Sequence, residues 1–312
     1  MAEKSFTYLS SDNKNEISAK IWINEDVKNV AVLQIAHGMV EHKGRYEGFA
    51  KWLSDNGIIV CANDHLGHGD SVSCEEDRGF VDGKDAGAFL IEDMNTLKTQ
   101  IHDAYPELPY FILGHSMGSF MVRRFLTKYS DDLAGAIIMG TGYNAPAAAD
   151  FGVTITRLFA LFKGWRYRSR FVQNLTKNKC HKHLDTTDTD ISNSWLTRDP
   201  EVVKKYREDP KSGFLFTLAG HKMLFESVAF TSRETNIKAI PKEMPLLVIS
   251  GGDDPVGMCG ERVKLFTDKL VKTGHTKVTL KLYDDDRHEI LNELNKDEVY
   301  ADILNWIKGN VK

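Results

Sequence analysis

The chain has 312 residues, 42% of them hydrophobic and 27% charged, with a formal net charge of -4. These values are typical of a globular protein, and the acidic balance excludes a general attraction to nucleic acid. Residues 1–25 lack the apolar core of a signal peptide, no apolar run approaches the about 18 residues of a membrane span, and no two cysteines form a Cys-x-x-Cys pair, so we expect a cytoplasmic protein.

Short β-type segments alternate with helical patterns over the first part of the chain. The expected strands are residues 5–10 and 16–23, as an opening hairpin, then 31–36, 58–63, 110–114 and 135–140, with expected helices at 45–56, 85–105 and 117–129. Such alternation predicts an α/β fold with a mostly parallel central sheet flanked by helices.

The same alternation returns near the C-terminus, so both ends of the chain should contribute to one sheet. Strands are expected at 245–251 and 277–283, and helices at 259–273 and up to Lys308. The interval 143–232 lacks strand-like runs, which predicts a helical cap between a first core part, 1–142, and a second core part, 233–312. A separate domain with its own core is the alternative interpretation of this interval.

The stretch GHSMG places Ser116 between Gly114 and Gly118, after an apolar strand and before a helical pattern. Small residues on both sides allow a tight turn that holds a serine outward in a strained conformation, as a nucleophile requires. The backbone N–H of Met117 would then point to where a carbonyl oxygen gains charge.

A serine nucleophile needs an acid and a histidine further along the chain. Asp253 and Asp254 follow one buried strand, and His288 follows the next. Since sites in such sheets lie at the carboxyl ends of the strands, these side chains should meet Ser116 at one edge. His288 would accept the serine proton, and one of the two aspartates would orient the ring. The acid run 284–286 is expected to be a solvated surface.

Five stretches, at 36–46, 63–71, 113–119, 250–257 and 287–293, resemble the α/β-hydrolases of the monoacylglycerol lipase and lysophospholipase-type carboxylesterases. The resemblance implies an α/β-hydrolase fold and selects Asp254, three residues after Gly251, over Asp253. It also implies that the N–H of Met39 is the second oxyanion donor.

The resemblance further assigns His37, Glu41 and Arg45 to the site. His37 should shape the loop, whereas Glu41 and Arg45 either fix loop geometry or bind the hydroxyls of a glycerol-like alcohol. Asp64 and His65 are expected to brace a neighbouring loop. The pair His181 and His183 could bind zinc, but the sequence places no complete set of ligands, so we expect no metal and no cofactor.

Residues 157–182 combine basic and aromatic side chains, in contrast to the acidic whole. Such a segment either contacts an anionic membrane or a phosphate head group, or is a solvated face of the cap. The sequence therefore predicts a serine hydrolase for lipophilic esters, such as monoacylglycerols or lysophospholipids. An amide hydrolase or peptidase with the same triad and a non-catalytic lipid-binding protein are the alternatives, and the oligomeric state is not indicated.

Overall fold

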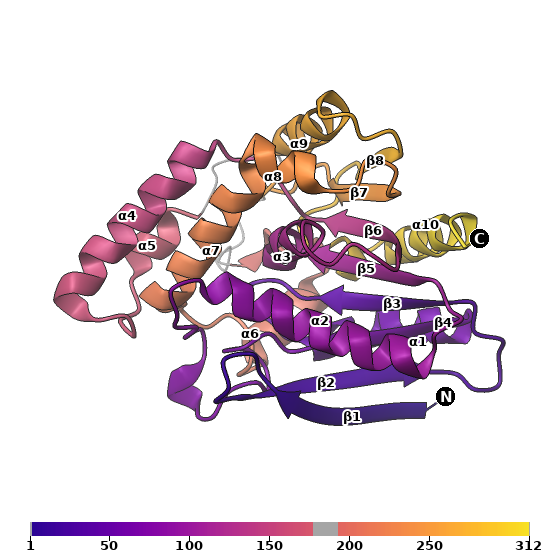
Figure 1. Ribbon diagram of the computed structural model, residues 1–312. Helices are drawn as coiled ribbons and strands as arrows, with labels where there is room; N and C mark the ends of the chain where they lie inside the picture. Colours follow the sequence, from indigo (N-terminus) through magenta and orange to yellow (C-terminus); the bar gives the residue numbers. More distant parts are fainter. Residues whose placement is uncertain (1, 177–192, 312) are drawn as a thin grey trace.

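A computed structural model describes residues 2–176 and 193–311 and contains one eight-stranded sheet (Figure 1). Its order is β1-β2-β4-β3-β5-β6-β7-β8. The strands are β1 Ala2–Leu9, β2 Glu16–Ile23, β3 Ala31–Ala36, β4 Ile58–Asn63, β5 Tyr110–His115, β6 Leu133–Met139, β7 Leu246–Gly251 and β8 Val278–Tyr283. Strands β3 to β8 pair in parallel, whereas β1 pairs with β2 and β2 with β4 in antiparallel fashion. The predicted α/β fold and opening hairpin are confirmed.

Helices cover both faces of this sheet. The elements of the core are η1 Lys43–Tyr46, α1 Glu47–Asp55, η2 Glu75–Asp77, α2 Ala86–Ala104, α3 Met117–Phe125, α9 Glu261–Lys272, η4 Ile290–Asn292 and α10 Lys296–Gly309. One apolar cluster joins α2, α3 and α9 to the sheet, and a second joins α1 and α10 to its opposite face. Every residue of β3, β4, β5 and β7 is buried, which explains why these strands are continuous apolar runs without alternation.

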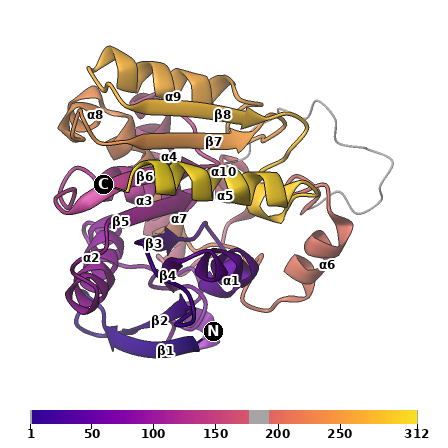
Figure 2. The ribbon, with the colours of Figure 1, turned by 90° about the vertical axis from the view of Figure 1, so that its right-hand side faces the viewer.

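The chain between β6 and β7 supplies a group of helices and no strand of the sheet among its described residues. They are α4 Pro146–Lys163, α5 Arg170–Asn174, α6 Pro200–Glu208, α7 Leu218–Ser232 and α8 Glu234–Ala239. Figure 1 shows α4, α5 and α7 gathered beyond one end of the sheet, and in Figure 2 α6 and α2 lie on opposite sides of the strands. Helix α4 begins with Pro146 in its first turn and ends at Lys163, because the φ of 78° at the following Gly164 does not continue a helix.

Candidate active site

Ser116 occupies the turn between β5 and α3, in a backbone conformation that is strained for a side-chain-bearing residue. Its φ is 52° and its ψ is -118°. The Ser116 N–H donates to the carbonyl of Met139 on β6 at 3.0 Å, which ties the turn to the neighbouring strand. Strain of this kind persists only where the surroundings enforce it, and it holds the serine side chain outward at the end of the sheet.

The two glycines of the turn are required by close backbone contacts. A Cβ on Gly114 would collide with the carbonyl of Gly118, and a Cβ on Gly118 would collide with the carbonyls of Ala36 and His37. Helix α3 therefore begins directly against the end of β3. This contact brings the loop after β3 next to Ser116, because a Cβ on Gly38 would lie 3.1 Å from Ser116 Cβ.

Asp254 and His288 form a buried hydrogen-bonded pair at the same end of the sheet. The Nδ1 of His288 lies 3.0 Å from Asp254 Oδ1, and the residues are 2% and 0% exposed. Asp254 also accepts from the Val256 N–H at 2.8 Å and from the Ser250 hydroxyl at 3.0 Å. Burial raises the pKa of Asp254, but the charge and hydrogen bond of His288 and these two donors outweigh it, so the pKa lies below its usual value. An ionised Asp254 requires Nδ1 to carry the proton, which leaves Nε2 as the basic nitrogen.

The loop that carries His288 lies across the end of β7. A Cβ on Gly251 would collide with the carbonyls of Asp286 and Arg287, so only glycine permits this crossing. The His288 ring lies 4.6 Å from the ring of His115, the residue before Ser116, measured between centroids. No hydrogen bond joins Ser116 Oγ to the His288 ring, although the structure describes both residues.

The two adjacent aspartates differ in their surroundings. Only Asp254 contacts His288, whereas Asp253 is half-buried and its N–H donates to the carbonyl of Asp286. The expectation of a solvated acid run is correct for the exposed 284–285 pair but wrong for Asp286, which is fully buried. Burial and the nearby Glu293 raise the pKa of Asp286 to about 7. Its ion pair with Arg198, at 2.6 Å, explains why an acid occupies this position.

The proposed oxyanion donors are the backbone N–H groups of Met39 and Met117. Met39 follows Gly38 in the loop after β3, and Met117 is the first residue of α3. Neither N–H has a hydrogen-bond acceptor among the residues that the structure describes. Because α3 begins there, Met117 is one of the unsatisfied donors of a helix N-terminus, which favours negative charge.

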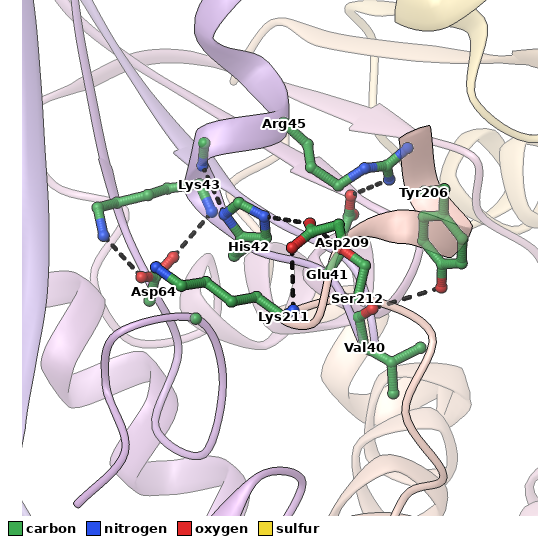
Figure 3. A network of polar contacts seen from close by, with 12 residues as sticks. Val40, Glu41, His42, Lys43, Arg45, Asp64, Tyr206, Asp209, Lys211 and Ser212 are labelled. Carbon is green, nitrogen blue, oxygen red and sulfur yellow. Dashed lines mark hydrogen bonds and ion pairs between the residues drawn. The ribbon is translucent and has the colours of Figure 1, made fainter. Parts of the chain in front are cut away.

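Glu41 and Arg45 belong to a buried network rather than to an open pocket. Arg45 Nη1 lies 2.7 Å from Glu41 Oε2, and its guanidinium forms two 2.6 Å contacts with the carboxylate of Glu289. Glu41 Oε1 accepts from the Gly38 N–H at 2.5 Å and from the Tyr46 hydroxyl at 2.9 Å. Figure 3 shows Arg45 above Glu41, with Tyr206 of α6 beside them. These contacts favour the loop-fixing role over a substrate-binding role.

His115 connects this network to the histidine loop. Its Nδ1 lies 3.2 Å from Glu41 Oε1 and 3.0 Å from the Tyr46 hydroxyl, and its Nε2 lies 3.1 Å from the backbone carbonyl of His288. Burial lowers the pKa of His115, but the hydrogen bond and charge of Glu41 outweigh it, so the pKa is raised. Sequence reasoning missed His115 and Glu289, although both lie inside the quoted motifs.

His37 shapes the loop from inside the protein. It is fully buried; its Nδ1 donates to the carbonyl of Gly38 at 2.8 Å, and its Nε2 accepts from the His65 N–H at 2.9 Å. The rings of His37 and His65 lie 4.3 Å apart between centroids, and His68 packs beside them. Since His37 has no access to solvent, its contacts are those of a loop-shaping residue rather than a substrate-binding one.

A second set of contacts joins the loop after β3 to α6 and to Asp64 (Figure 3). Asp64 accepts from the Lys43 N–H at 2.8 Å and from Lys43 Nζ at 2.6 Å, as expected of a bracing group. His42 Nε2 lies 2.7 Å from Asp209 Oδ2, and the Tyr206 hydroxyl donates to the carbonyl of Val40 at 3.3 Å. The loop that bears Met39 is therefore held from both sides.

Within the described residues, no group of three or more His, Cys, Asp or Glu side chains could hold a metal ion. The histidines at 181 and 183, and the end of the basic stretch, lie outside those residues. None of the described helices is long and apolar enough to cross a bilayer.

Comparison with known families finds a match over residues 27–295 to the family described as "Serine aminopeptidase, S33". Among curated proteins, an uncharacterized abhydrolase domain-containing protein of Dictyostelium discoideum is 26% identical over 99% of this chain, which spans only 29% of that protein's length. A monoacylglycerol lipase of Mycolicibacterium smegmatis is 29% identical over 93% of this chain and 92% of the relative.

Among solved structures, a highly thermostable carboxyl esterase from Bacillus coagulans in complex with glycerol superposes with a TM-score of 0.90. The two chains are 28% identical and cover each other completely. These comparisons confirm the predicted α/β-hydrolase fold and the predicted resemblance to the monoacylglycerol lipases.

Proposed function

Because this chain belongs to the serine aminopeptidase S33 family, we propose that it hydrolyses lipophilic carboxylic esters, such as monoacylglycerols or lysophospholipids, through Ser116, Asp254 and His288. The observation that carries the proposal is the buried Asp254–His288 pair at the end of the sheet where Ser116 is held in a strained turn. The names of the lipase and esterase relatives support an ester as substrate.

Acylation follows from the protonation state of the pair. Ser116 Oγ attacks the ester carbonyl carbon while His288 Nε2 accepts the hydroxyl proton, and the carbonyl oxygen becomes an oxyanion near the N–H groups of Met39 and Met117. Asp254 stabilises the imidazolium that forms, because it stays ionised at 3.0 Å from Nδ1. When the oxyanion collapses, the C–O bond to the alcohol breaks and the alcohol leaves with the proton from His288.

Deacylation uses the same groups in reverse order. His288 accepts a proton from water, which attacks the acyl carbon, and the acyl–oxygen bond to Ser116 breaks as His288 returns the proton to the serine. The products are a fatty acid and free enzyme. The strained turn stays fixed throughout, because the Ser116 N–H remains bonded to Met139 on β6.

We further propose that residues 143–232 act as a cap above this site. Its described part contacts the histidine loop through the Glu289 N–H, which donates to the carbonyl of Leu196 at 2.7 Å, and through the ring of Trp195, 5.0 Å from that of His288. A cap that touches the base would exclude water from the reacting ester.

The outer surface of the cap supports contact with an anionic bilayer. Large apolar side chains are exposed on α4, α5 and their flanks, with Leu161 and Phe162 each 80% exposed. Lys163 and Arg170 are exposed beside them. An apolar surface with cationic neighbours suits the boundary between lipid head groups and acyl chains.

Sedimentation with vesicles tests this contact. Leu161→Glu together with Phe162→Glu should weaken binding to vesicles of phosphatidylcholine with phosphatidylserine, and Val271→Glu on α9, which replaces another exposed apolar residue, should not. Equal binding by both variants would contradict the proposed surface.

The catalytic proposal is tested with p-nitrophenyl butyrate and a panel of monoacylglycerols and lysophospholipids. Ser116→Ala should abolish turnover and labelling by a fluorophosphonate while leaving the melting temperature close to that of the unchanged protein. Turnover that survives this substitution would refute the assigned nucleophile. A wild-type protein that neither labels nor turns over would support the non-catalytic alternative.

The family description favours a second candidate, an aminopeptidase. Such an enzyme needs a free carboxylate to bind the ammonium group of a peptide, but Glu41 and Glu289 are both paired with Arg45. This pairing favours the ester as substrate. Faster cleavage of aminoacyl p-nitroanilides than of any ester would reverse this preference.

A further inference from the structure

The carbonyl oxygen of Ser116 receives a side-chain hydrogen bond that the reaction above does not use. Ser119 Oγ lies 2.6 Å from it, and the Ser119 N–H donates to the same oxygen at 2.9 Å. Since a carbonyl oxygen can only accept, the single hydroxyl proton of Ser119 must point to Ser116. Ser119 is completely buried, so water cannot replace this bond.

Thr141, just after β6, is the next residue in this series of hydrogen bonds. Its Oγ1 lies 2.9 Å from Ser119 Oγ. Because the Ser119 proton is already directed at Ser116, Thr141 is the donor in this contact. Arg123 Nη1 in turn lies 3.4 Å from Thr141 Oγ1, and a guanidinium can only donate. Every hydrogen bond in the series therefore points from Arg123 towards the Ser116 carbonyl.

Arg123 is an unusual cation for the inside of a protein. It is 1% exposed, and no carboxylate forms an ion pair with it in the part of the chain that the structure describes. It donates to the carbonyls of Gly142 and Thr231, each at 2.9 Å, and its guanidinium carbon lies 3.9 Å from the Phe266 ring centroid. Burial lowers the pKa of Arg123 to about 9, so the group is charged at neutral pH.

The Ser116 carbonyl and the Met117 N–H belong to one peptide group, and that N–H is one of the two proposed oxyanion donors. Hydrogen bonds in series polarise one another, and a donor at the carbonyl oxygen makes the N–H of the same peptide a stronger donor. We propose that Arg123, Thr141 and Ser119 form a polarising chain that strengthens the Met117 N–H in the oxyanion hole. This inference rests on the proposed function, because it requires Ser116 to be the nucleophile.

The expected effect is small but measurable. Loss of a whole oxyanion donor lowers kcat by about 10²- to 10³-fold, and polarisation changes the strength of a hydrogen bond by about 10–30%. Losing 10–30% of the stabilisation free energy of such a donor therefore corresponds to a loss of about two- to eightfold in kcat. KM should not change, because the oxyanion exists only after the attack.

Thr141→Val and Thr141→Ser form a matched pair for the test. Valine has the shape of threonine without the hydroxyl, whereas serine keeps the hydroxyl and loses the methyl group. Thr141→Val should lower kcat about two- to eightfold and should weaken the binding of an alkyl trifluoromethyl ketone inhibitor by the same factor. This ketone binds when Ser116 Oγ adds to its carbonyl carbon, the hydroxyl proton moves to His288 and the carbonyl oxygen becomes an oxyanion. Thr141→Ser should retain both values, and inhibition by a long-chain alcohol should be equal in the two variants.

If Thr141 had a purely structural role, its substitution would change the melting temperature without lowering kcat at an unchanged KM. If Thr141→Val and Thr141→Ser have equal kcat and equal ketone affinity while Ser116→Ala is inactive, the polarising chain is refuted and the proposed function stands. If Ser116→Ala remains active, both are refuted. Ser119→Ala gives a second measurement, in which the loss should equal or exceed that of Thr141→Val.

Discussion

Replacing Arg45 by methionine distinguishes a loop-fixing role of the buried network from a substrate-binding role. The change keeps most of the side-chain volume but leaves the carboxylates of Glu41 and Glu289, which are 5% and 4% exposed, without their cation. Burial alone would raise the pKa of Glu41, but His115 and Arg45 hold it well below its usual range, so this carboxylate is charged. The variant therefore buries negative charge without compensation.

The cost follows from this burial. Breaking a buried ion pair by removal of one partner costs about 3–5 kcal/mol. The entropy of unfolding, about 2.1 cal/mol/K per residue, amounts to about 0.65 kcal/mol/K for 312 residues, so the melting temperature should fall by about 5–8 °C. Arg233→Met is the matched control, because Arg233 and its partner Asp150 are 45% and 52% exposed and such a pair contributes about 0–1 kcal/mol.

Thermal unfolding followed by circular dichroism gives the stability, and kcat/KM is measured for a monoacylglycerol and for p-nitrophenyl butyrate, which lacks a glycerol group. A loop-fixing Arg45 predicts that both substrates lose the same factor. An unchanged melting temperature, with a raised KM for the monoacylglycerol alone, would refute the reasoning and assign Arg45 to the alcohol group of the substrate.

Two further outcomes are expected. Asp254→Asn should lower kcat on p-nitrophenyl butyrate by about 10⁴-fold with little loss of stability, because the amide no longer enforces the required tautomer of His288. The control Asp253→Asn should keep a kcat within a few-fold of wild type. Similar losses in both variants would contradict the assignment of Asp254. Burial lowers the pKa of His68 from 6.5 to about 4, so the contribution of the neutral ring to stability is present above pH 6.5 and is lost as the pH falls. Between pH 7 and 5.5, the free energy of unfolding in urea should therefore fall by about 1.2 kcal/mol less in His68→Phe than in wild type. Equal losses would show that His68 is not kept neutral.

The strands and the Ser116 turn were predictable because their signals are local. A buried strand such as 58–63 is a continuous apolar run, and Gly114 and Gly118 flank Ser116 within five residues. The mostly parallel order then requires that residues after successive strands meet at one end of the sheet. Fold class and the candidate positions of the site therefore follow from short stretches of sequence.

The buried polar network was not predictable in the same way. Arg45 and Glu289 are separated by 244 positions, so no local pattern links them. Asp286 stands in a run of three acids and looks like a surface residue, but Arg198, 88 positions away, pairs with it in the interior. Such pairs form because particular loops meet at the end of the sheet in the tertiary structure. The periodicity of the sequence does not indicate which loops meet.

The contacts between α6 and the loop after β3 tie the helical segment between β6 and β7 to the core beside Met39. The carbonyl of Val40 accepts from both the Gly213 N–H and the Tyr206 hydroxyl, one residue after Met39. An outward displacement of α6 would break the Tyr206 bond and loosen the segment that contains Met39. The backbone beside Met39 is thus coupled to the docking of α6, so a substitution in that helix should also act on the loop after β3.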